Sequence, residues 1–187
     1  MVRERVDAVV SYMDKCFCKE YKDYVFKEFE IRYIPKDDII SRVTLIPKDA
    51  AEHIADLSTR VNILFAGIVI GWMKKGKKFI PSTHLFNLAI HESFEFGCAV
   101  VAKEQGAKAF LYGKDLLIAS VDRFLYPVER GLYVAVIDPE DMTAIGIGRL
   151  VINPGNFDRY VSEGRVLLPA VENVFDLGKL LRNESYV

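Results

Sequence analysis

The sequence predicts an α+β fold with two different halves. The N-terminal half is expected to hold a mainly antiparallel sheet with helices packed on it, and the C-terminal half a small, strongly curved β pseudo-barrel with short helices. Apolar residues recur at helical spacing over residues 3–18, and over residues 29–33 they alternate with charged ones, as in a half-buried strand. Gly146 and Gly148 lie two apart in the apolar run 143–152, where glycines indicate a bulge, a barrel corner or a close backbone approach.

The N-terminal half is expected to place its strands between helices. After the helix at residues 3–18, a second helix begins at Pro47, because proline suits the first helical turn. A third follows Ser82 or Thr83, either of which can cap it. The predicted strands of this half are residues 24–34, 43–46, 61–72, the returning hairpin strand 79–80, and 98–103.

A short polar stretch, residues 103–107, is predicted to join two domains, residues 1–104 and residues 105–187. It contains one glycine and is too short to act as a flexible tether. Residues 110–112 are apolar and aromatic and follow it directly, so we expect them to wedge against the first domain.

The second domain is predicted to be built around a β-hairpin. Residues 132–137 and 143–152 are its strands, and the turn at 138–141 contains proline and aspartate, both favoured in turns. A further strand is expected at residues 165–171, and a terminal helix at 174–182.

The composition favours a cytoplasmic protein. About half of the 187 residues are hydrophobic, and the formal net charge is −1. No apolar run reaches the ~18–20 residues of a membrane span, and the charged N-terminus is unlike a signal peptide. Three cysteines cannot form a complete disulfide framework, which indicates a reducing compartment. We therefore expect a soluble cytoplasmic chain that binds no membrane.

The sequence contains no recognisable motif of catalytic residues. Gly146 and Gly148 lack the third glycine of a dinucleotide-binding fingerprint, and the residues after them continue as a strand. Residues 113–115 lack the remainder of a phosphate-binding loop, and no serine sits in a nucleophile elbow. We expect a protein that is not an enzyme, has no catalytic residue and needs no cofactor.

A metal site is not expected either. His91 and Glu92 lack the second histidine of the zinc-protease signature His-Glu-x-x-His. Cys16, Cys18 and Cys98 supply three sulfurs, one ligand short of a structural zinc site.

Several pieces of the chain resemble a known family in the same order and at similar spacing. They are Arg60–Gly71, Lys77–Ile80, Thr83–Leu85, Phe110–Gly113 and Asp176–Arg182. The family is the Nip-seven family of large-subunit pre-ribosome assembly factors, in which an α/β N-terminal domain precedes a PUA domain. Phe110–Asp115, the strand from Gly131 and the hairpin closing on Gly146–Arg149 are similar to the PUA domain itself, a small pseudo-barrel that binds RNA.

The resemblance implies a non-catalytic RNA-binding factor in large ribosomal subunit biogenesis, acting in pre-rRNA processing or assembly. Its expected partners are rRNA or pre-rRNA and other ribosome-assembly or RNA-processing proteins, which would dock on the N-terminal domain. We expect the protein itself to be a monomer, and the resemblance implies a nucleolar location if the source is a eukaryote. Two alternatives stay open: a protein-interaction adaptor in RNA processing, and an accessory PUA subunit of an RNA-modification system.

Cations that flank the PUA-like pieces are the first candidate RNA contacts. They are Lys114, Arg123, Arg149, Arg165, Lys179 and Arg182. Residues 106–187 nevertheless carry nine lysines and arginines against eleven acidic residues, a net charge of −2. Because strong nucleic-acid binders are usually basic, RNA binding requires that these cations gather on one face.

A lysine cluster in the first domain is the second candidate. Lys74, Lys75, Lys77 and Lys78 surround a glycine at a predicted hairpin tip. They form either a solvated turn or a phosphate contact to rRNA, since lysine acts as a point charge. We expect contacts mainly to phosphates and RNA shape, with little reading of bases.

Overall fold

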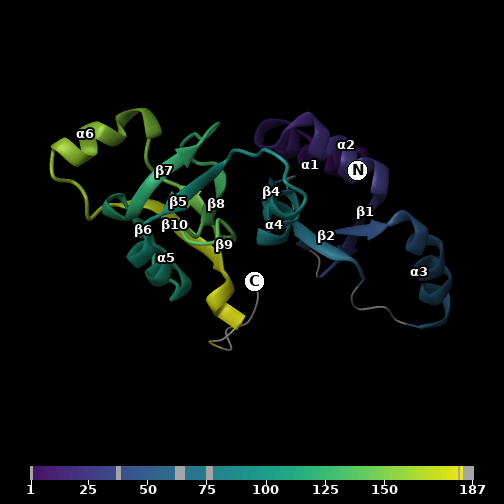
Figure 1. The fold of residues 1–187 in the computed structure, drawn as a ribbon. Coiled ribbons are helices and arrows are strands. Elements are labelled where there is room, and N and C mark those ends of the chain that lie inside the picture. The colour runs from purple at the N-terminus through teal and green to yellow at the C-terminus, as the bar shows by residue number, and fades with distance from the viewer. Residues whose placement is uncertain (1, 37–38, 62–65, 75–77, 181, 183–187) are drawn as a thin grey trace. The chain divides into compact units, whose positions relative to one another are not determined.

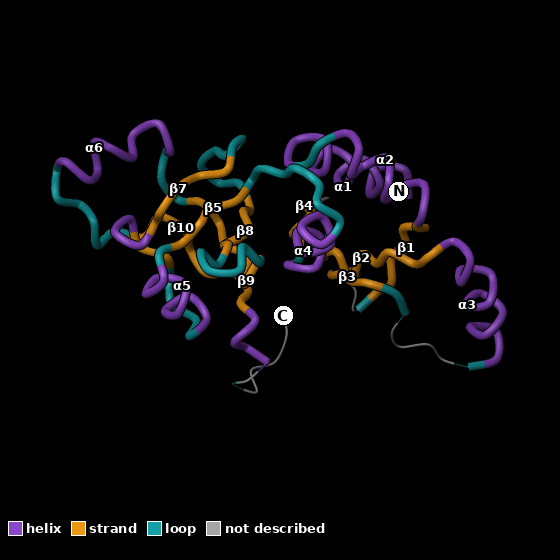
Figure 2. The backbone as a smooth tube through the Cα atoms, viewed as in Figure 1, coloured by secondary structure: helices purple, strands orange, loops and turns teal. Residues whose placement is uncertain are grey.

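The computed structural model describes residues 2–36, 39–61, 66–74, 78–180 and 182, and the chain forms two compact units, residues 1–95 and 96–187. Both units mix helices and strands, so the predicted α+β fold is confirmed. The first unit holds an antiparallel sheet with helices, and the second a curled half-barrel sheet with short helices (Figures 1 and 2).

The sheet of the first unit is antiparallel, with its four strands in chain order β1-β2-β3-β4. No helix in the described part of the chain is both long and apolar enough to cross a membrane. The elements of this unit are α1 (Val2–Cys16), α2 (Lys19–Glu28), β1 (Phe29–Pro35), β2 (Ile40–Pro47), α3 (Lys48–Arg60), β3 (Ile68–Lys74), β4 (Lys78–Pro81) and α4 (Thr83–His91).

The core of the first unit contains residues of α1, α2 and α4 together with residues of the sheet. Met13 of α1 is fully buried, as its helical periodicity predicts. The ring of Tyr12 packs edge-on against Phe79 of β4, with centroids 5.5 Å apart. The Tyr21 hydroxyl of α2 donates a 2.7 Å hydrogen bond to the Leu85 carbonyl of α4. Burial raises the pKa of Tyr21, so this hydroxyl remains a donor.

The first predicted strand is correct only in its second part. Residues 24–28 belong to α2, and β1 begins at Phe29. Tyr21 and Val25, four residues apart, are both buried, so the helical spacing continues through residues that we had assigned to a strand. From its first residue onward, β1 pairs antiparallel with β2.

The predicted central strand, residues 61–72, is realised only in its second part, because β3 begins at Ile68 and Val61 is the C-cap of α3. Residues 62–65 lie outside the described residues, and β3 continues to Lys74. It pairs with β2 on one side and β4 on the other, so its central position is confirmed. The helix expected from Pro47 is α3, with that proline as its N-cap.

The second unit is a six-stranded sheet in the order β6-β10-β9-β8-β5-β7. The sheet curls into a half-barrel (Figure 2). Its elements are β5 (Ala99–Ala102), α5 (Glu104–Leu111), β6 (Leu116–Leu117), η1 (Ile118–Ser120), β7 (Val121–Leu125), β8 (Tyr133–Ile137), β9 (Ala144–Leu150), η2 (Pro154–Asn156), α6 (Phe157–Ser162), β10 (Pro169–Asp176) and η3 (Leu177–Leu180).

Strand β5 belongs to the second unit, whereas we had assigned residues 98–103 to the first domain. It pairs parallel with β8 and antiparallel with β7. All four of its residues are fully buried, as in a central strand with both faces covered. The compact units accordingly divide between Glu95 and Phe96, ahead of the boundary predicted after residue 104.

The polar stretch 103–107 is not a linker, because most of it forms the first turn of α5. Gly106, the residue that suggested a loop, allows close packing instead, since a Cβ there would overlap the Ser120 side chain. Phe110 lies in the core cluster of the second unit, so the prediction that it wedges against the first domain is wrong.

The predicted hairpin is confirmed as β8 and β9. The Asp138 N–H donates to the Thr143 carbonyl at 2.8 Å across its turn. The expected close approach at the strand glycines is also present. A Cβ at Gly146 would lie 2.5 Å from both Phe110 Cε1 and the Phe175 carbonyl oxygen. Only glycine therefore lets α5 and β10 pack this closely on β9.

The C-terminal elements differ from prediction. The last strand, β10, runs from Pro169 to Asp176 and pairs with β9 and β6. Residues 165–168 precede it, and residues 174–176, predicted as the start of a helix, continue the strand because they pair with β9 as far as Gly146. The expected terminal helix is reduced to the short turn η3.

We predict that Gly146→Ala lowers the free energy of unfolding by about 1–3 kcal/mol, the usual cost of overpacking a tight site. Urea denaturation of the full chain measures this. The matched control is Gly155→Ala, where a Cβ would meet only Asn153 Oδ1 at 3.4 Å. That change is expected to alter stability by at most about 0.5 kcal/mol. Equal stability of the two variants would contradict the close approach at Gly146.

Candidate functional site

Helix α5 ends in a Schellman motif that shapes the segment after it. Gly113 adopts the left-handed conformation, with φ of +78°. Its N–H donates to the Phe110 carbonyl at 2.9 Å, and the Lys114 N–H donates to the Ala109 carbonyl at 3.2 Å. Glycine is favoured at this position because it has no Cβ to clash. The chain therefore turns sharply after Tyr112, and we call residues 111–115 the 111–115 loop.

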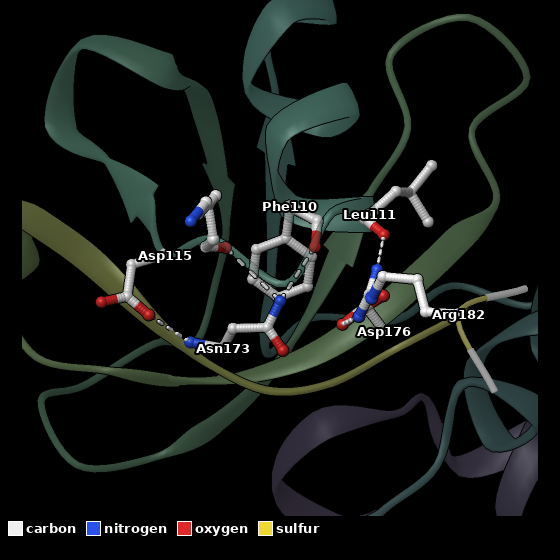
Figure 3. A network of polar contacts seen from close by, with 7 residues as sticks. Phe110, Leu111, Asp115, Asn173, Asp176 and Arg182 are labelled. Carbon is white, nitrogen blue, oxygen red and sulfur yellow. Dashed lines mark hydrogen bonds and ion pairs between the residues drawn. The ribbon is translucent and has the colours of Figure 1, made fainter. Parts of the chain in front are cut away.

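Asn173 of β10 holds the 111–115 loop from one side (Figure 3). Its side-chain Nδ2 donates to the Phe110 carbonyl at 2.9 Å and to the Lys114 carbonyl at 3.4 Å. Its backbone N–H donates to Asp115 Oδ1 at 2.8 Å. A single residue of β10 thus fixes the end of α5 and both ends of the turn that follows.

Arg182 holds the same loop from the other side. Its guanidinium donates to the Leu111 carbonyl, and Nη2 also donates to Asp176 Oδ2 at 3.1 Å (Figure 3). Asp176 is fully buried, and 22% of the Arg182 side chain is exposed. Arg182, one of the predicted RNA contacts, therefore bridges the end of β10 and the 111–115 loop.

The turn η3 approaches the loop through Gly178. A Cβ at this position would overlap the Leu111 carbonyl oxygen and lie 2.9 Å from Asp176 Oδ1. That carboxylate oxygen accepts no hydrogen bond from the described residues. Lys179 follows Gly178 directly in η3 and is half-buried.

Three other predicted contacts are arginines held by acidic neighbours. The hydrogen bond that Arg149 of β9 donates to Glu172 of β10 raises the pKa of the arginine. These carboxylates offset the positive charges locally, and the pairs belong to different parts of the unit. The ion pairs are Arg123–Asp122 at 2.7 Å, Arg149–Glu172 at 2.6 Å and Arg165–Glu163 at 3.1 Å.

Lys114 and Lys179 differ from these arginines, because neither forms an ion pair with any described residue. Lys114 belongs to the 111–115 loop, and Lys179 follows Gly178, whose backbone lies against the Leu111 carbonyl of that loop. Arg182, a third predicted cation, donates to the same carbonyl. In the first unit, Lys74 and Lys78 face each other across the β3–β4 pair and are exposed, while Lys75 and Lys77 lie outside the described residues.

The 111–115 loop therefore offers one lysine, Lys114, that forms no ion pair with a described residue, and an exposed tyrosine, Tyr112, on a backbone held from both sides. Cationic side chains of this kind can bind phosphate groups. Nowhere in the described part of the chain do three histidine, cysteine, aspartate or glutamate side chains lie together as metal ligands would.

Comparison with known families gives the second unit its identity. Residues 98–185 match the UPF0113 PUA domain. They form a PUA domain. The match begins close to the start of the second unit at residue 96, and it contains the 111–115 loop, Asn173 and Arg182. No curated protein matches the chain.

Two crystal structures show the same fold at low sequence identity. A hypothetical protein from the archaeon Pyrococcus horikoshii OT3 is 13% identical, with a TM-score of 0.64, and the similarity covers 98% of this chain and 96% of that one. A PUA domain protein from Aeropyrum pernix K1, crystallised with tartrate, is 16% identical, with a TM-score of 0.51 over 89% of this chain and 87% of that one. The likeness to the first covers nearly the full length of both chains.

Sequence reasoning missed Asn173 and the exposure of Tyr112. Asn173 falls between the predicted strand 165–171 and the predicted helix from residue 174, so it had no assigned environment. Tyr112 was expected to pack against the first domain, yet 74% of it is exposed. The signal that was available is Gly113, since a glycine after a helix indicates a Schellman turn whose preceding side chain can point outward.

Replacing Arg182 tests how much the stability of the fold depends on the Asp176–Arg182 ion pair. We predict that Arg182→Ala lowers the free energy of unfolding by about 2–3 kcal/mol, less than for a wholly buried pair, because 22% of the arginine side chain is exposed. The loss arises from leaving a buried carboxylate without its partner. Adding Asp176→Asn removes that charge, so the double variant should be more stable than Arg182→Ala alone. Strictly additive losses in urea denaturation would show that the two residues are not coupled.

Proposed function

We propose that this protein binds RNA through its PUA domain, and that Lys114 and Lys179 contact RNA phosphates at the 111–115 loop. The observation that carries this proposal is the contrast among the cations. The predicted arginines of the second unit are paired with carboxylates, whereas the two lysines at this loop pair with no described acidic residue. PUA domains are RNA-binding modules, and the match over residues 98–185 supports the same role here.

Lysine suits phosphate binding that carries little sequence information. It acts as a flexible point charge, whereas arginine offers the fork that reads guanine or grips a phosphate with two bonds. The C-terminal part of the chain has a net charge of −2 over residues 106–187, so long-range attraction of RNA is weak. Binding then depends on local contacts, and we expect modest affinity that falls steeply with salt.

In the fuller form of the proposal, the protein is a non-catalytic factor in large ribosomal subunit assembly or pre-rRNA processing. The ordered resemblance of segments in both halves to the Nip-seven family supports this. The first unit would dock other assembly or RNA-processing proteins, and the chain would act as a cytoplasmic monomer. A protein-interaction adaptor, or an accessory subunit of an RNA-modification system, would carry the same PUA domain with a different partner.

The first test is the salt dependence of RNA binding by Lys114→Ala/Lys179→Ala. Each lysine that releases a counterion contributes about 0.7–0.9 to the slope of log K against log salt, so the double variant should lose about 1.4–1.8 of that slope. Fluorescence anisotropy with a structured rRNA fragment measures it across a salt series.

The matched control is Arg159→Ala, which removes a cation that is already paired with Glu163 at 2.7 Å. That variant should keep the wild-type slope. RNA binding that stays weaker than ~10⁻⁴ M at low salt would reject the proposal, since this is the floor of non-specific binding, and would favour the adaptor. An unchanged salt slope in the double variant would show that RNA does not contact these two lysines at the 111–115 loop.

The lysine cluster of the first unit is tested separately. Replacing Lys74, Lys75, Lys77 and Lys78 together by alanine should reduce the salt slope while leaving the preference among RNA sequences unchanged, because lysines contact phosphates and not bases. Competition between RNAs of different sequence measures the preference. A changed preference would show that the cluster takes part in base recognition.

A further inference from the structure

In the described part of the chain, four strands lie at the edges of the two sheets, and three of them carry features that discourage pairing with another chain. β4 is four residues long and contains a lysine and a proline, and β6 is two residues long. β7 carries the exposed, charged Asp122 and Arg123, and its pairing with β5 has a register shift. Short length, charge, proline and irregular pairing are the usual means by which proteins block an open strand edge.

β1, the fourth edge strand, has a regular and largely apolar edge. It is seven residues long, contains no lysine, and has its single proline as its last residue. Its pairing with β2 continues from Phe29 to Pro35 without a register shift, and no other described strand pairs with it. The apolar residues Phe29, Ile31, Tyr33 and Ile34 are only partly buried. A strand of this kind is a template on which a further strand can pair.

The backbone of β1 directs alternate residues toward β2 and toward the open edge. The Thr44 hydroxyl of β2 donates to the Arg32 carbonyl at 3.2 Å, so this carbonyl faces β2. In a strand, the N–H and carbonyl of one residue point to one side, and those of the next residue point to the other. The Ile31 N–H and carbonyl therefore face the open edge, where a second antiparallel strand would form its hydrogen bonds.

The side chains of β1 complement themselves when two copies of the strand run antiparallel. If Ile31 lies opposite Ile31 of a second copy, then Glu30 lies opposite Arg32 and Phe29 lies opposite Tyr33, and two-fold symmetry makes each of these pairs occur twice. Glu30 and Arg32 share one face of β1, where their side chains are 46% and 27% exposed. Both charges are therefore accessible to a neighbouring strand.

Charge selects this register over its neighbours. The smallest shift that keeps the hydrogen-bonding sides of the two strands matched is two residues. Such a shift places either Glu30 opposite Glu30 or Arg32 opposite Arg32 of the second copy. Like charges directly opposite each other destabilise a sheet, so the register centred on Ile31 is the favoured one.

We propose that β1 pairs with β1 of a second copy of this chain, antiparallel and centred on Ile31, and so forms a reversible homodimer whose first-unit sheet continues from one copy into the other. The pairing covers only residues 29–33 of each copy, so the association is weak. The monomer of the proposed function is the dissociated state of this equilibrium. The inference goes beyond that function and does not depend on RNA binding.

Reversing one charge at a time tests the pairing and its register. Glu30→Arg places two arginines opposite each other at both ends of the pairing, and Arg32→Glu does the same with two glutamates. Each variant alone should raise the dissociation constant of the homodimer about tenfold or more, because two attractive pairs become repulsive. A mixture of the two variants places opposite charges across the pairing again and should recover the wild-type association.

Sedimentation equilibrium of the full chain measures these constants over a concentration series that reaches about 1 mM, where very weak complexes form. The matched control is Lys108→Glu, which reverses the charge of a lysine that is paired with Glu104 in the second unit. This variant should keep the wild-type dissociation constant. Urea denaturation identifies any single variant that does not fold. In that case the double variant Glu30→Arg/Arg32→Glu, which keeps opposite charges within the strand and across the pairing, must dimerise as the wild type does.

The outcomes decide the proposal without involving RNA. Weakened association of each single variant, with recovery in the mixture, supports it. A wild type that stays monomeric throughout the series overturns it and leaves the open edge of β1 to a strand of a different protein. Single variants that associate as tightly as the wild type also overturn it, because the two charges would then not lie opposite each other. A mixture of folded variants that fails to recover association does the same.

Discussion

The buried carboxylate of Asp176 is the constraint on which the candidate site depends. A charge taken out of water at the end of β10 must be paired, and Arg182 supplies the partner while also donating to the Leu111 carbonyl. One side chain therefore joins the last strand, the turn η3 and the end of α5. The arginine that pairs with the buried Asp176 carboxylate also holds the backbone of the 111–115 loop, so the position of this loop depends on the core beneath it.

Glycines make this arrangement sterically possible. Gly146 lets Phe110 and β10 close on β9, and Gly178 lets η3 touch the loop. Gly113 ends α5 in the left-handed conformation that turns the chain outward. Backbone contacts this close leave the segments few alternative arrangements, and they put Asn173 and Arg182 within bonding distance of the loop from opposite sides.

Electrostatics at the site are decided locally and not by the net charge of the domain. Arginine pairs such as Arg149–Glu172 cancel charge across the sheet, so a domain with more acidic than basic residues can still present a spot where a lysine, Lys114, forms no ion pair with a described residue. Such a spot attracts an anion only at short range, because salt screens it within about 8 Å at physiological ionic strength. If this loop binds RNA as proposed, binding relies on the shape of the loop more than on long-range electrostatic attraction.

The sequence by itself determined the elements whose causes are local. The β8–β9 hairpin follows from turn residues between two apolar runs, and α3 and α4 begin directly after Pro47 and Ser82, close to where they were expected. Only the tertiary structure decided the sheet of β5, because a fully buried apolar run fits any central strand and its parallel partner β8 lies far along the chain. It also decided that Arg182 joins β10 to the 111–115 loop and that Lys179 forms no ion pair with any described residue. Ion pairs between residues distant in sequence depend on strand register, and strand register cannot be derived from the amino-acid composition.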